Sequence, residues 1–427
     1  MKAKSTWFTF LWKQLMNTRV PIKLTTIFLL IIGMNMTSFA ATIYVDQING
    51  DDMNDGLTLN TAVATITQSS LIAADGDTIN VAQGVYSVTS GESFPVTFEN
   101  VAAIQGAGVD LTVLDGELTT SVLEINSDST LNLDGIAVIN GFGSASSPGA
   151  GIDMSSTTQI NLSNCLVENN EGNVGGGLFV VNTPIISINN CEFIGNEAAI
   201  GGAMQIQINS DIDVIMEVSQ SMFSNNKGAI GTAIHFQENG AGQHTLNIDQ
   251  TQFVNNESTG VAYQANSNTS FGLISNSIFA EHPGTAVSAS SSDIDVINVT
   301  FVNNDKALVV GSQAEIVNSI FWNNEDEISG SGGSISYSIV QGLDIDEHND
   351  DGNNLDIDPL LDNNYRLSMT SPAIDMGNDQ AAIDFGLTQD IDSEPRIVDA
   401  FGFNRPEGVV DIGADEVPDL IFADGFE

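Results

Sequence analysis

The stretch Ile188-Asn-Asn-Cys-Glu-Phe193-Ile-Gly-Asn196, followed by Gly201-Gly-Ala-Met204, decides the fold of this chain. Its Phe-x-x-Asn core recurs at Phe223–Asn226, Phe253–Asn256, Phe301–Asn304 and Phe321–Asn324, with degenerate copies at Val167–Asn170 and Phe279–His282. The first residues of these units are spaced by 26, 30, 30, 26, 22 and 20 residues. Self-similarity at a fixed period of about 20 to 50 residues is typical of a solenoid.

The residues before each Phe alternate between apolar and polar, as at Ile186, Ile188 and Phe193. The same alternation runs through residues 246–253. A period of two puts one set of side chains inward on a β-strand, and a coil that cannot bury this face alone must stack on its neighbours. The consensus of leucine-rich repeats and the hairpin signals of propeller blades are absent. We therefore predict an all-β, right-handed, single-stranded parallel β-helix solenoid with an N-terminal cap and a C-terminal capping module.

The Asn that ends each unit predicts a second stack. Side-chain amides at the same turn of successive coils would bond to one another along the axis as a ladder. The predicted members are Asn170, Asn196, Asn226, Asn256, Asn304 and Asn324. Such a row could also bind a ligand, but we interpret it as structural. The glycine runs Gly175–Gly177 and Gly201–Gly202 supply the backbone freedom that solenoid corners require.

Cys165 and Cys191 stand 26 residues apart, the same spacing as Val167 and Phe193 beside them. They should therefore lie one above the other on adjacent coils, about 4.8 Å apart. That separation permits a disulfide, and it also permits two stacked buried thiols. Both alternatives stay open. A chain with only two cysteines fits an exported protein that does not depend on disulfides.

The first forty residues have the order of a secretory signal peptide. Five basic residues precede an apolar stretch at Leu24–Met36, and Ser38-Phe-Ala40 places small residues where a cleavage site needs them. We expect residues 1–40 to be removed, so that the mature chain begins at Ala41. The apolar stretch is short for a membrane span, and an uncleaved anchor is the alternative.

The composition is strongly acidic. The 427 residues hold 55 Asp and Glu against 10 Lys and Arg, a net charge of −45. Removing residues 1–40 leaves five basic against 55 acidic residues, a net charge of −50. Such a field repels nucleic acid and anionic lipid, so we expect no nucleic-acid partner. Solubility outside the cell is the simplest explanation of the charge.

The mature N-terminus carries a first resemblance. Thr42-Ile-Tyr-Val-Asp46 is followed by Asn49-Gly-Asp-Asp-Met-Asn-Asp-Gly56, and then by Ala73-Ala-Asp-Gly-Asp-Thr-Ile-Asn-Val81 and Gly84-Val-Tyr86. This series resembles the opening coils of pectin-lyase-like β-helix proteins, and it implies the same fold. Members usually have a proline before a Thr-Ile step, which is missing before Thr65-Ile66, so we expect a modified cap. The Phe-x-x-Asn and Gly-Gly-Ala units are also similar to polymorphic outer-membrane-protein repeats.

The C-terminal part resembles a different module. Asp356-Ile-Asp-Pro-Leu-Leu361, Tyr365-Arg-Leu367, Ser371-Pro-Ala-Ile-Asp-Met-Gly377, Asp392-Ser-Glu-Pro-Arg396 and Val410-Asp-Ile-Gly-Ala-Asp-Glu416 occur in that order. They resemble the choice-of-anchor Q module at the ends of exported bacterial β-helix proteins. We interpret these motifs as closing the open end of the solenoid, because an uncovered terminal coil presents unpaired strand edges.

The predicted organisation is therefore a signal peptide at 1–40, a parallel β-helix at 41–345, a capping or anchoring module at 346–417 and a tail at 418–427. The sequence from Asp419 to Glu427 is similar to the short Asp-Gly-Phe-Glu tails of some exported proteins of Gram-negative bacteria. It is either a sorting signal or a polar end. We expect an extracellular or outer-surface location in a Gram-negative bacterium.

No residues stand out as catalytic. A lyase acting on uronates needs a cationic base, and the only basic residues on the coils are Lys227 and Lys306, three coils apart. A hydrolase needs converging carboxylates, and Asp293 and Asp295 alternate on one predicted strand that could face outward. The histidines, none of which adjoins a nucleophile motif, are His235, His244, His282 and His348. We lean against an enzyme and keep a polysaccharide lyase or glycoside hydrolase as the alternative.

Calcium is the one cofactor that the sequence suggests. Oxygen ligands are dense near 344–358, where part of the series follows the positions of a calcium loop without its flanking helices. The candidate ligands are Asp346, Glu347, Asn349, Asp351 and Asp358. Asp51, Asp52 and Asp55 form a second candidate cluster. The competing interpretation of 344–358 is an acidic linker.

Trp322, the only tryptophan of the mature chain, follows Phe321 and should face outward. Its ring could stack on a sugar or pack against a neighbouring loop. The function that we expect is an interaction, adhesion-type or structural role at the cell surface or outside the cell. Its partners would be an extracellular glycan or the surface of a host or neighbouring cell, besides the export machinery that reads the signal peptide.

Overall fold

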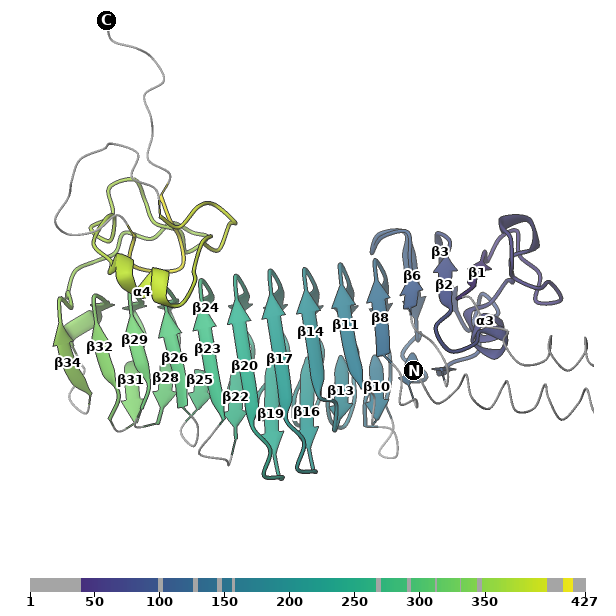
Figure 1. Ribbon diagram of the computed structural model, residues 1–427, viewed down its shortest axis with the longest axis horizontal. Helices are drawn as coiled ribbons and strands as arrows, with labels where there is room; N and C mark the ends of the chain where they lie inside the picture. Colours follow the sequence, from purple (N-terminus) through teal and green to yellow (C-terminus); the bar gives the residue numbers. More distant parts are fainter. Residues whose placement is uncertain are drawn as a thin grey trace, which may run out of the picture. The chain divides into compact units, whose positions relative to one another are not determined.

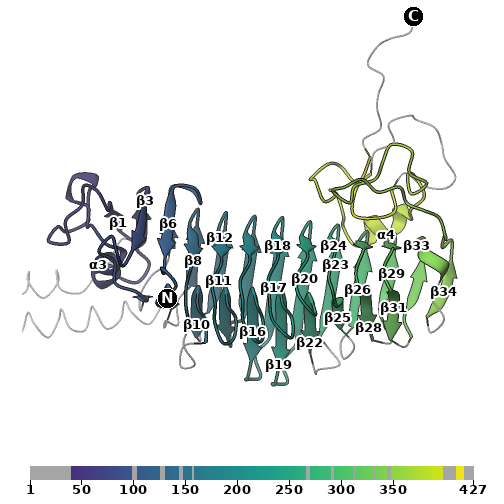
Figure 2. The same cartoon turned by 180° about the vertical axis from the view of Figure 1, so that it is seen from behind.

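A computed structural model describes residues 40–98, 103–125, 130–143, 148–155, 158–265, 270–289, 293–311, 313–330, 332–343, 348–397 and 410–417. The chain divides into two compact units, Met1–Ala40 and Ala41–Glu427. The predicted signal peptide and tail lie outside the described residues. Within the second unit, three parallel sheets run side by side along one axis (Figures 1 and 2). This arrangement confirms the predicted parallel β-helix.

Sheet A has 13 strands in the described residues. They are β1 (Thr42–Val45), β2 (Thr78–Val81), β5 (Ala103–Gln105), β8 (Thr130–Asp134), β11 (Gln159–Ser163), β14 (Ile185–Asn189), β17 (Val214–Ser219), β20 (His244–Asp249), β23 (Phe271–Ser275), β26 (Asp293–Ile297), β29 (Glu315–Val317), β32 (Ser334–Ser336) and β34 (Asn349–Gly352). Buried and exposed residues alternate along them, as in Ile160, Leu162 and their neighbours. The alternation puts the apolar set into the core of the solenoid.

Sheet B has 11 strands in the described residues, most of them three residues long. They are β3 (Gly84–Ser87), β6 (Thr112–Asp115), β9 (Ala137–Ile139), β12 (Leu166–Glu168), β15 (Glu192–Ile194), β18 (Met222–Ser224), β21 (Gln252–Val254), β24 (Ile278–Ala280), β27 (Thr300–Val302), β30 (Ile320–Trp322) and β33 (Ile339–Val340). They carry the repeat unit found in the sequence, because Phe193 of β15 pairs in register with Val167 and Phe223.

Sheet C completes each coil with 10 strands in the described residues. They are β4 (Val96–Phe98), β7 (Leu123–Ile125), β10 (Ile152–Ser155), β13 (Leu178–Val181), β16 (Met204–Ile208), β19 (Ile234–Glu238), β22 (Val261–Gln264), β25 (Thr285–Ala289), β28 (Lys306–Val310) and β31 (Asp326–Gly330). Apolar residues of the three sheets form one continuous core from Ile43 to Val340. Each coil buries its apolar face only because the next coil covers it.

The keyed Phe residues stack inside sheet B as the repeat predicts. The rings of Phe193, Phe223, Phe253, Phe279, Phe301 and Phe321 are fully buried. Successive ring centroids are 4.5–5.0 Å apart and the planes differ by at most 13°. The spacing of the coils sets this distance, since it equals the separation of neighbouring strands. The Phe column therefore gives the solenoid a continuous aromatic core along several coils.

The predicted amide ladder is confirmed and lies at the corner between sheets B and C. Asn196 Nδ2 donates to Asn226 Oδ1 at 3.1 Å, and Asn226 Nδ2 donates to Asn256 Oδ1 at 2.8 Å. His282 fills the next rung, where its Nδ1 accepts from the N–H of Asn256 at 3.0 Å and its own N–H donates to Asn304 Oδ1 at 3.0 Å. The ladder is structural, since it satisfies the polar groups of a corner buried from water.

The N-terminal cap is built around helix α3 (Ile66–Ile72), preceded by the 3-10 helix η1 (Leu59–Thr61). Thr65 is the N-cap, and its side chain accepts from the N–H of Gln68 at 3.0 Å. The buried Glu92 carboxylate accepts from the first two helical N–H groups, at 2.7 Å and 3.0 Å. These acceptors satisfy the helix terminus without the proline that the family usually carries. No helix among the described residues is long and apolar enough to cross a membrane.

The C-terminal residues 353–417, as far as they are described, pack on the outer flank of the last coils, and they include the short helix α4 (Asp379–Asp384). Three apolar clusters bury this contact. They are Ile297, Val317, Ala381, Ala382, Leu387 and Val410; Ile278, Ala280, Val302, Ile391 and Ala414; and Ile320, Ile339, Leu367, Ala373 and Ile412. The module thus lies along the flank, which corrects our interpretation that its motifs close the open end.

The last coil has charged residues on its outermost strand that disfavour pairing with another chain. Asp350 of β34 takes the register position of Ile335 in β32, so a carboxylate replaces an apolar residue in the outermost strand. Asn349, Asp350 and Asp351 are all exposed there. Charged residues on an edge strand disfavour pairing with another chain. The 3-10 helix η2 (Gln341–Leu343) leads from sheet B into this last coil.

Candidate functional site

The corner between sheets A and B presents one amide side chain per coil. Each of these residues has a left-handed backbone with φ between 43° and 56°, which Asn tolerates better than most residues. We call this series the corner amide row and each member a rung: Asn164, Asn190, Gln220, Gln250, Asn276, Asn298 and Asn318. The first three rungs are exposed and the last four are buried. The burial begins where the C-terminal segment covers the row.

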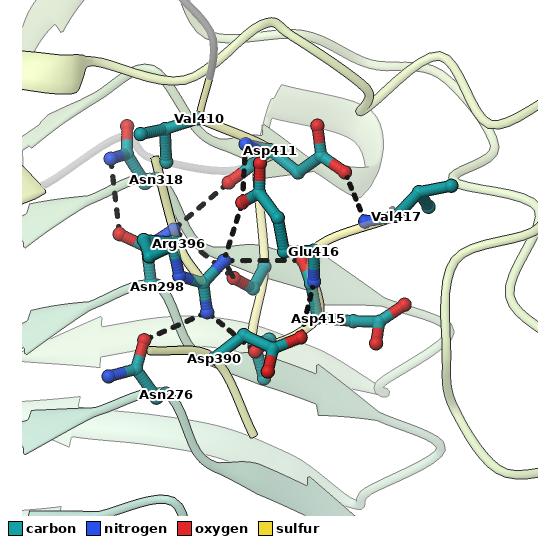
Figure 3. A network of polar contacts seen from close by, with 12 residues as sticks. Asn276, Asn298, Asn318, Asp390, Arg396, Val410, Asp411, Asp415, Glu416 and Val417 are labelled. Carbon is teal, nitrogen blue, oxygen red and sulfur yellow. Dashed lines mark hydrogen bonds and ion pairs between the residues drawn. The ribbon is translucent and has the colours of Figure 1, made fainter. Parts of the chain in front are cut away.

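The C-terminal segment binds this row largely through its main chain. Asn298 Nδ2 donates to the carbonyl oxygens of Asp411 at 2.9 Å and Gly413 at 3.2 Å. Asn318 Nδ2 donates to the carbonyl of Asn378 at 3.1 Å, and Asn318 Oδ1 accepts from the N–H of Asn378 at 2.6 Å. Figure 3 shows these two rungs beneath the loop that carries Val410 to Val417. Main-chain groups that would otherwise be buried without partners are satisfied in this way.

Two further rungs extend the contact toward the N-terminus. Gln250 Nε2 donates to the carbonyl of Asp390 at 2.5 Å and to Ser393 Oγ at 3.2 Å. Gln220 Nε2 also reaches Ser393 Oγ, at 3.3 Å. Asn276, the rung between Gln250 and Asn298, accepts from Arg396. The row therefore holds the C-terminal segment on five successive coils.

Arg396 is the centre of the contact. Its side chain is fully buried, with 0% of its surface accessible to solvent. Its terminal nitrogens donate to Asn276 Oδ1 (2.8 Å), the carbonyls of Ala414 (2.6 Å), Gly413 (3.2 Å) and Asp415 (3.2 Å), and Glu416 Oε2 (3.3 Å). Guanidinium groups suit such a fan of acceptors because their donors lie in one rigid plane. Arg396 therefore ties the loop at 410–417 to the solenoid (Figure 3).

Buried carboxyl groups surround Arg396. Burial raises the pKa of Glu416 to about 9, with a further increase from the charge of Asp411 and a decrease from Arg396. Burial likewise raises the pKa of Asp411 to about 7, although its carboxylate accepts from the N–H groups of Asp375 at 2.7 Å and Val417 at 2.8 Å. Desolvation of the charged form is the dominant cause in both cases. Near neutral pH, Glu416 is protonated.

Every Lys and Arg in the described part of the chain has a carboxylate partner. The pairs are Lys227 with Glu197 (3.9 Å), Lys306 with Asp326 (2.5 Å), Arg366 with Asp392 (2.6 Å) and Arg396 with Glu416 (3.3 Å). Lys227 and Lys306 are the surface lysines that the sequence indicated, with side chains 60% and 45% exposed.

The histidines have structural positions. His235, His244 and His282 are buried, and His348 Nδ1 lies 2.5 Å from the carbonyl of Gly332. His244 Nε2 lies 3.2 Å from Glu238 Oε1 inside the solenoid core. Burial lowers the pKa of His282 to about 4 and also lowers the pKa of His235. His282 lines a groove at the corner between sheets B and C, but it is only 1% exposed and its lowered pKa keeps the ring neutral near neutral pH.

Outward-facing carboxylates occur on adjacent coils of sheet A. Asp293 and Asp295 face outward on β26, as the sequence suggested, with buried Ile294 between them. Asp295 Oδ1 accepts from the N–H of Glu315 on the next coil at 2.9 Å. Burial, together with the charges of Glu315 and Asp293, raises the pKa of Asp295 to about 6. This group is the best candidate for acid–base chemistry on the described surface.

An acidic groove lies at the corner between sheets B and C. Its volume is about 620 Å³, and its walls include Glu281, Asp305 and Glu325 on successive coils. Asn303 and Asn323, which follow the same corner, complete one side. The groove has the same sign of charge as the whole chain, so it disfavours polyanionic ligands.

The structure describes three of the five candidate calcium ligands. Asn349, Asp351 and Asp358 are exposed, and Asp358 Oδ1 accepts from the N–H of Leu360 at 2.9 Å. Asp346 and Glu347 lie outside the described residues. Among the residues that are described, no group of three His, Cys, Asp or Glu side chains has a metal-binding arrangement. Calcium binding near 344–358 stays a prediction.

The aspartates of the N-terminal cap hold turns together. Asp52 Oδ1 accepts from the N–H groups of Ala64 at 2.8 Å and Thr65 at 2.9 Å. Asp51 and Asp55 each accept from the main-chain N–H two residues later. Aspartate commonly stabilises turns in this way. The candidate cluster has a structural use that needs no cation.

Cys165 and Cys191 lie on adjacent coils as predicted and are buried free thiols in the structure. Cys165 Sγ is 3.1 Å from the carbonyl of Ser163, and Cys191 Sγ is 3.3 Å from that of Asn189. The neighbouring Cys165 thiol and burial raise the pKa of Cys191. The structure thus corresponds to the alternative of two stacked thiols.

Trp322 is partly buried. It packs against the apolar cluster that includes Ile320, Ile339 and Leu367, where the C-terminal module meets sheet B. The outward position on β30 agrees with the sequence analysis, and the module takes the role of the neighbouring loop. Sugar stacking by Trp322 stays a prediction that this packing does not favour.

The corner amide row and Arg396 were not predicted from the sequence. A signal for the row was present, because an Asn or Gln stands three residues before every keyed position, from Asn164 before Val167 to Asn318 before Phe321. A polar residue at a fixed offset before a buried Phe marks a corner. Arg396 carries no comparable signal, since its side-chain partner Asn276 is 120 residues away.

These observations define the class: the chain is a parallel β-helix protein with a flank-bound C-terminal module. The family described as "Protein of unknown function (DUF1565)" matches residues 48–281, more than half of the 427 residues, and the chain belongs to this family. The resemblances to choice-of-anchor Q and polymorphic outer-membrane-protein sequences stay predictions.

Two solved structures are similar to the chain. A pectate lyase, Pel9A, has 14% identity over 89% of this chain and 97% of its own, with a TM-score of 0.48. A rhamnogalacturonan lyase has 11% identity over 81% of this chain and 98% of its own, with a TM-score of 0.40. No curated protein shows a significant match. Likeness at this level says nothing of activity.

Proposed function

We propose that this is an exported interaction protein, extracellular or on the outer surface of the cell, that binds through the lateral faces of its solenoid. The observation that carries the proposal is the corner amide row, where outward side chains of five successive coils hold a polypeptide segment. A solenoid repeats one local geometry along its length, so a surface that binds at one end presents similar groups further along.

The outer face of sheet A supports the same proposal. Ile185, Ile215, Thr245 and Phe271 occupy one register column on four successive strands. The three apolar members are 41%, 47% and 38% exposed. Exposed apolar side chains that gather along one face are characteristic of an interaction site. The net charge of −45 favours a neutral or cationic partner, such as a neutral glycan or a protein surface.

The decisive experiment separates binding from catalysis. Mature protein is incubated with a panel of neutral and acidic polysaccharides and with fixed bacterial or host cells. Retention on the ligand is scored together with new reducing ends and unsaturated products. Retention without cleavage is the expected outcome. Cleavage of any polysaccharide in the panel would contradict the proposal.

A second candidate is a carbohydrate-active enzyme, and Asp295 is the observation that favours it. Its raised pKa and its neighbour Glu315 on the adjacent coil are the elements of a hydrolytic acid–base pair. If cleavage is found, Asp295→Asn must abolish it, whereas Asp153→Asn must not. Asp153 is a matched control, because burial also raises its pKa to about 6 and Glu124 lies beside it in sheet C.

Export is tested with the full chain. Expression in a Gram-negative host is expected to give a mature protein that begins at Ala41, found by N-terminal sequencing in the medium or on the surface. Deleting residues 418–427 tests the tail separately. A mature chain that retains Met1 would contradict export by a cleaved signal, and an unchanged location without the tail would contradict a sorting role.

A further inference from the structure

The free end of the corner amide row resembles the end that is already occupied. We propose that Asn164 and Asn190 bind an extended, cationic polypeptide segment of another protein. The proposal rests on the interaction function above, and it names the site and the chemistry of the partner.

The occupied rungs show what a corner amide can do. Asn318 Nδ2 donates one hydrogen to Asn298 Oδ1 at 3.2 Å, which links the two rungs, and the other to the carbonyl of Asn378 at 3.1 Å. A carboxamide nitrogen carries two hydrogens, so one rung serves both its neighbour and a ligand. The ligand of the row in this case is the main chain of the C-terminal segment.

The exposed rungs Asn164 and Asn190 make the same hydrogen bond between neighbouring amides. Asn190 Nδ2 donates to Asn164 Oδ1 at 2.7 Å, and Asn164 Nδ2 donates to Asp134 Oδ1 at 2.7 Å. Both residues have φ of 51°, within the range of the occupied rungs. Each amide nitrogen therefore keeps a second hydrogen that faces solvent, at the position where Asn318 holds a main-chain carbonyl. An extended polypeptide running along the axis presents carbonyls to both.

The site continues directly from the existing contact. Ser393 accepts from Gln220, the rung next to Asn190, so the contact that the described residues make with the row reaches to within one coil of Asn190. Asn189 adds a second amide on the same side, donating to Ser219 Oγ at 2.9 Å. A bound segment would extend the C-terminal module along the corner by two more coils, about 10 Å.

The charges around these rungs specify a cationic partner. Asp134 bonds to Asn164, and Glu192 is exposed two residues after Asn190. Every described Lys and Arg of this chain is already paired with a carboxylate. With the described cations engaged elsewhere, a cationic segment of another protein would complement the negative charge of this corner.

The test uses full-length mature protein and fluorescently labelled synthetic peptides of equal length, one alternating Lys and Thr and one alternating Glu and Thr. Binding is measured by anisotropy at physiological ionic strength. The double variant Asn164→Gly/Asn190→Gly removes both amides and tolerates the left-handed backbone. The matched control is Asn225→Gly/Asn255→Gly, because these exposed residues form the same kind of amide pair at the other corner, with φ of 55° and 50°.

The wild type is expected to bind the Lys-Thr peptide and not the Glu-Thr peptide. The first double variant should bind about tenfold more weakly, since two hydrogen bonds are lost, and the control should bind like the wild type. Asn190→Asp should also weaken binding, because it removes the donor. Equal binding by all variants, or stronger binding by Asn190→Asp, would mean that only net charge attracts the peptide and would overturn the proposal.

The outcomes distinguish this inference from the proposed function. The wild type could fail to bind the Lys-Thr peptide and still be retained on a neutral glycan or on cells. That result would overturn the polypeptide site but not the interaction function. Cleavage of a polysaccharide overturns the interaction function itself. Circular dichroism of each variant confirms that the solenoid is folded before binding is compared.

Discussion

Asn298 donates a 2.9 Å hydrogen bond from its side chain to the main-chain carbonyl of Asp411, which lies 113 residues later in the sequence. Both residues are buried. Neither belongs to a regular strand pair or helix with the other, so this bond exists only once the C-terminal module has docked. The contact makes the module part of the folded solenoid, and it provides a direct way to test how firmly the module is held.

Asn298→Gly should loosen the module without disturbing the coil. Glycine accepts the φ of 56° at this position, while the carbonyl of Asp411 loses its donor and the carbonyl of Gly413 keeps only Arg396. Leaving buried acceptors unpaired costs about 1–3 kcal/mol. Urea denaturation should show this loss, and hydrogen exchange should accelerate at 410–417. The control Asn255→Gly, at an exposed rung of the other corner, should change stability by no more than about 0.5 kcal/mol.

Arg396→Met should be far more damaging than loss of an exposed cation. Removal of the guanidinium leaves several buried acceptors without a donor, and each unpaired acceptor costs about 1–3 kcal/mol. Arg396→Lys should not restore stability, since an ammonium cannot reach the five acceptors that the guanidinium serves. Lys306→Met is the comparison and should cost at most about 1 kcal/mol. Equal losses in thermal unfolding would contradict the central role of Arg396.

The stability of the module should fall as the pH rises. Folding raises the pKa of Glu416 from 4.5 to about 9, so the folded state holds a proton that the unfolded state has released. The stabilisation is complete below pH 4.5 and is lost progressively as the pH approaches 9. Asp411, with a pKa of about 7, contributes in the same direction over a narrower window.

Glu416→Gln isolates this effect, because glutamine is neutral at every pH. Melting temperatures of the wild type and the variant should diverge across the window, with the variant less sensitive to alkaline pH. The opposite result would be a wild type that gains stability relative to Glu416→Gln as the pH rises from neutral to alkaline. That result would show that Glu416 does not keep its proton in the folded state.

Cys165 and Cys191 should both react as thiols. Unfolded in denaturant without reductant, the mature protein should take up two alkylating groups, measured by mass spectrometry. Under native conditions both thiols should react slowly, since they are 2% and 1% exposed and thiolate formation at Cys191 is disfavoured. A mass with no adducts would establish the disulfide instead.

The repeat allowed the solenoid to be predicted because its information is local. Phe193 and Asn196 lie in one short unit. Repetition of that unit along the chain specifies both the Phe column and the amide ladder. His282 could be placed as a degenerate rung for the same reason. These features need only nearest-neighbour contacts between coils, which a sequence period encodes directly.

The docking of the C-terminal module could not be derived in this way, because its hydrogen bonds to the corner amide row join residues 60 to 173 positions apart. A partial signal is present in sheet B. Ile278-Phe-Ala280 and Ile320-Phe-Trp322 are apolar on both sides of the Phe, while Glu192-Phe-Ile194 has a charged residue there. A strand that is apolar on both faces is buried on both faces. The covered coils could be located from this change, but the segment that covers them could not.

The flank-bound module also changes how the solenoid can come apart. Stacked coils joined only to their neighbours can fray from an open end one coil at a time. Here a single segment bonds to Gln220, Gln250, Asn276, Asn298 and Asn318, so none of those five coils can open without breaking contacts that the others share. We therefore expect the five coils from Gln220 to Asn318 to unfold as one cooperative block, while the coils outside this block can open one at a time.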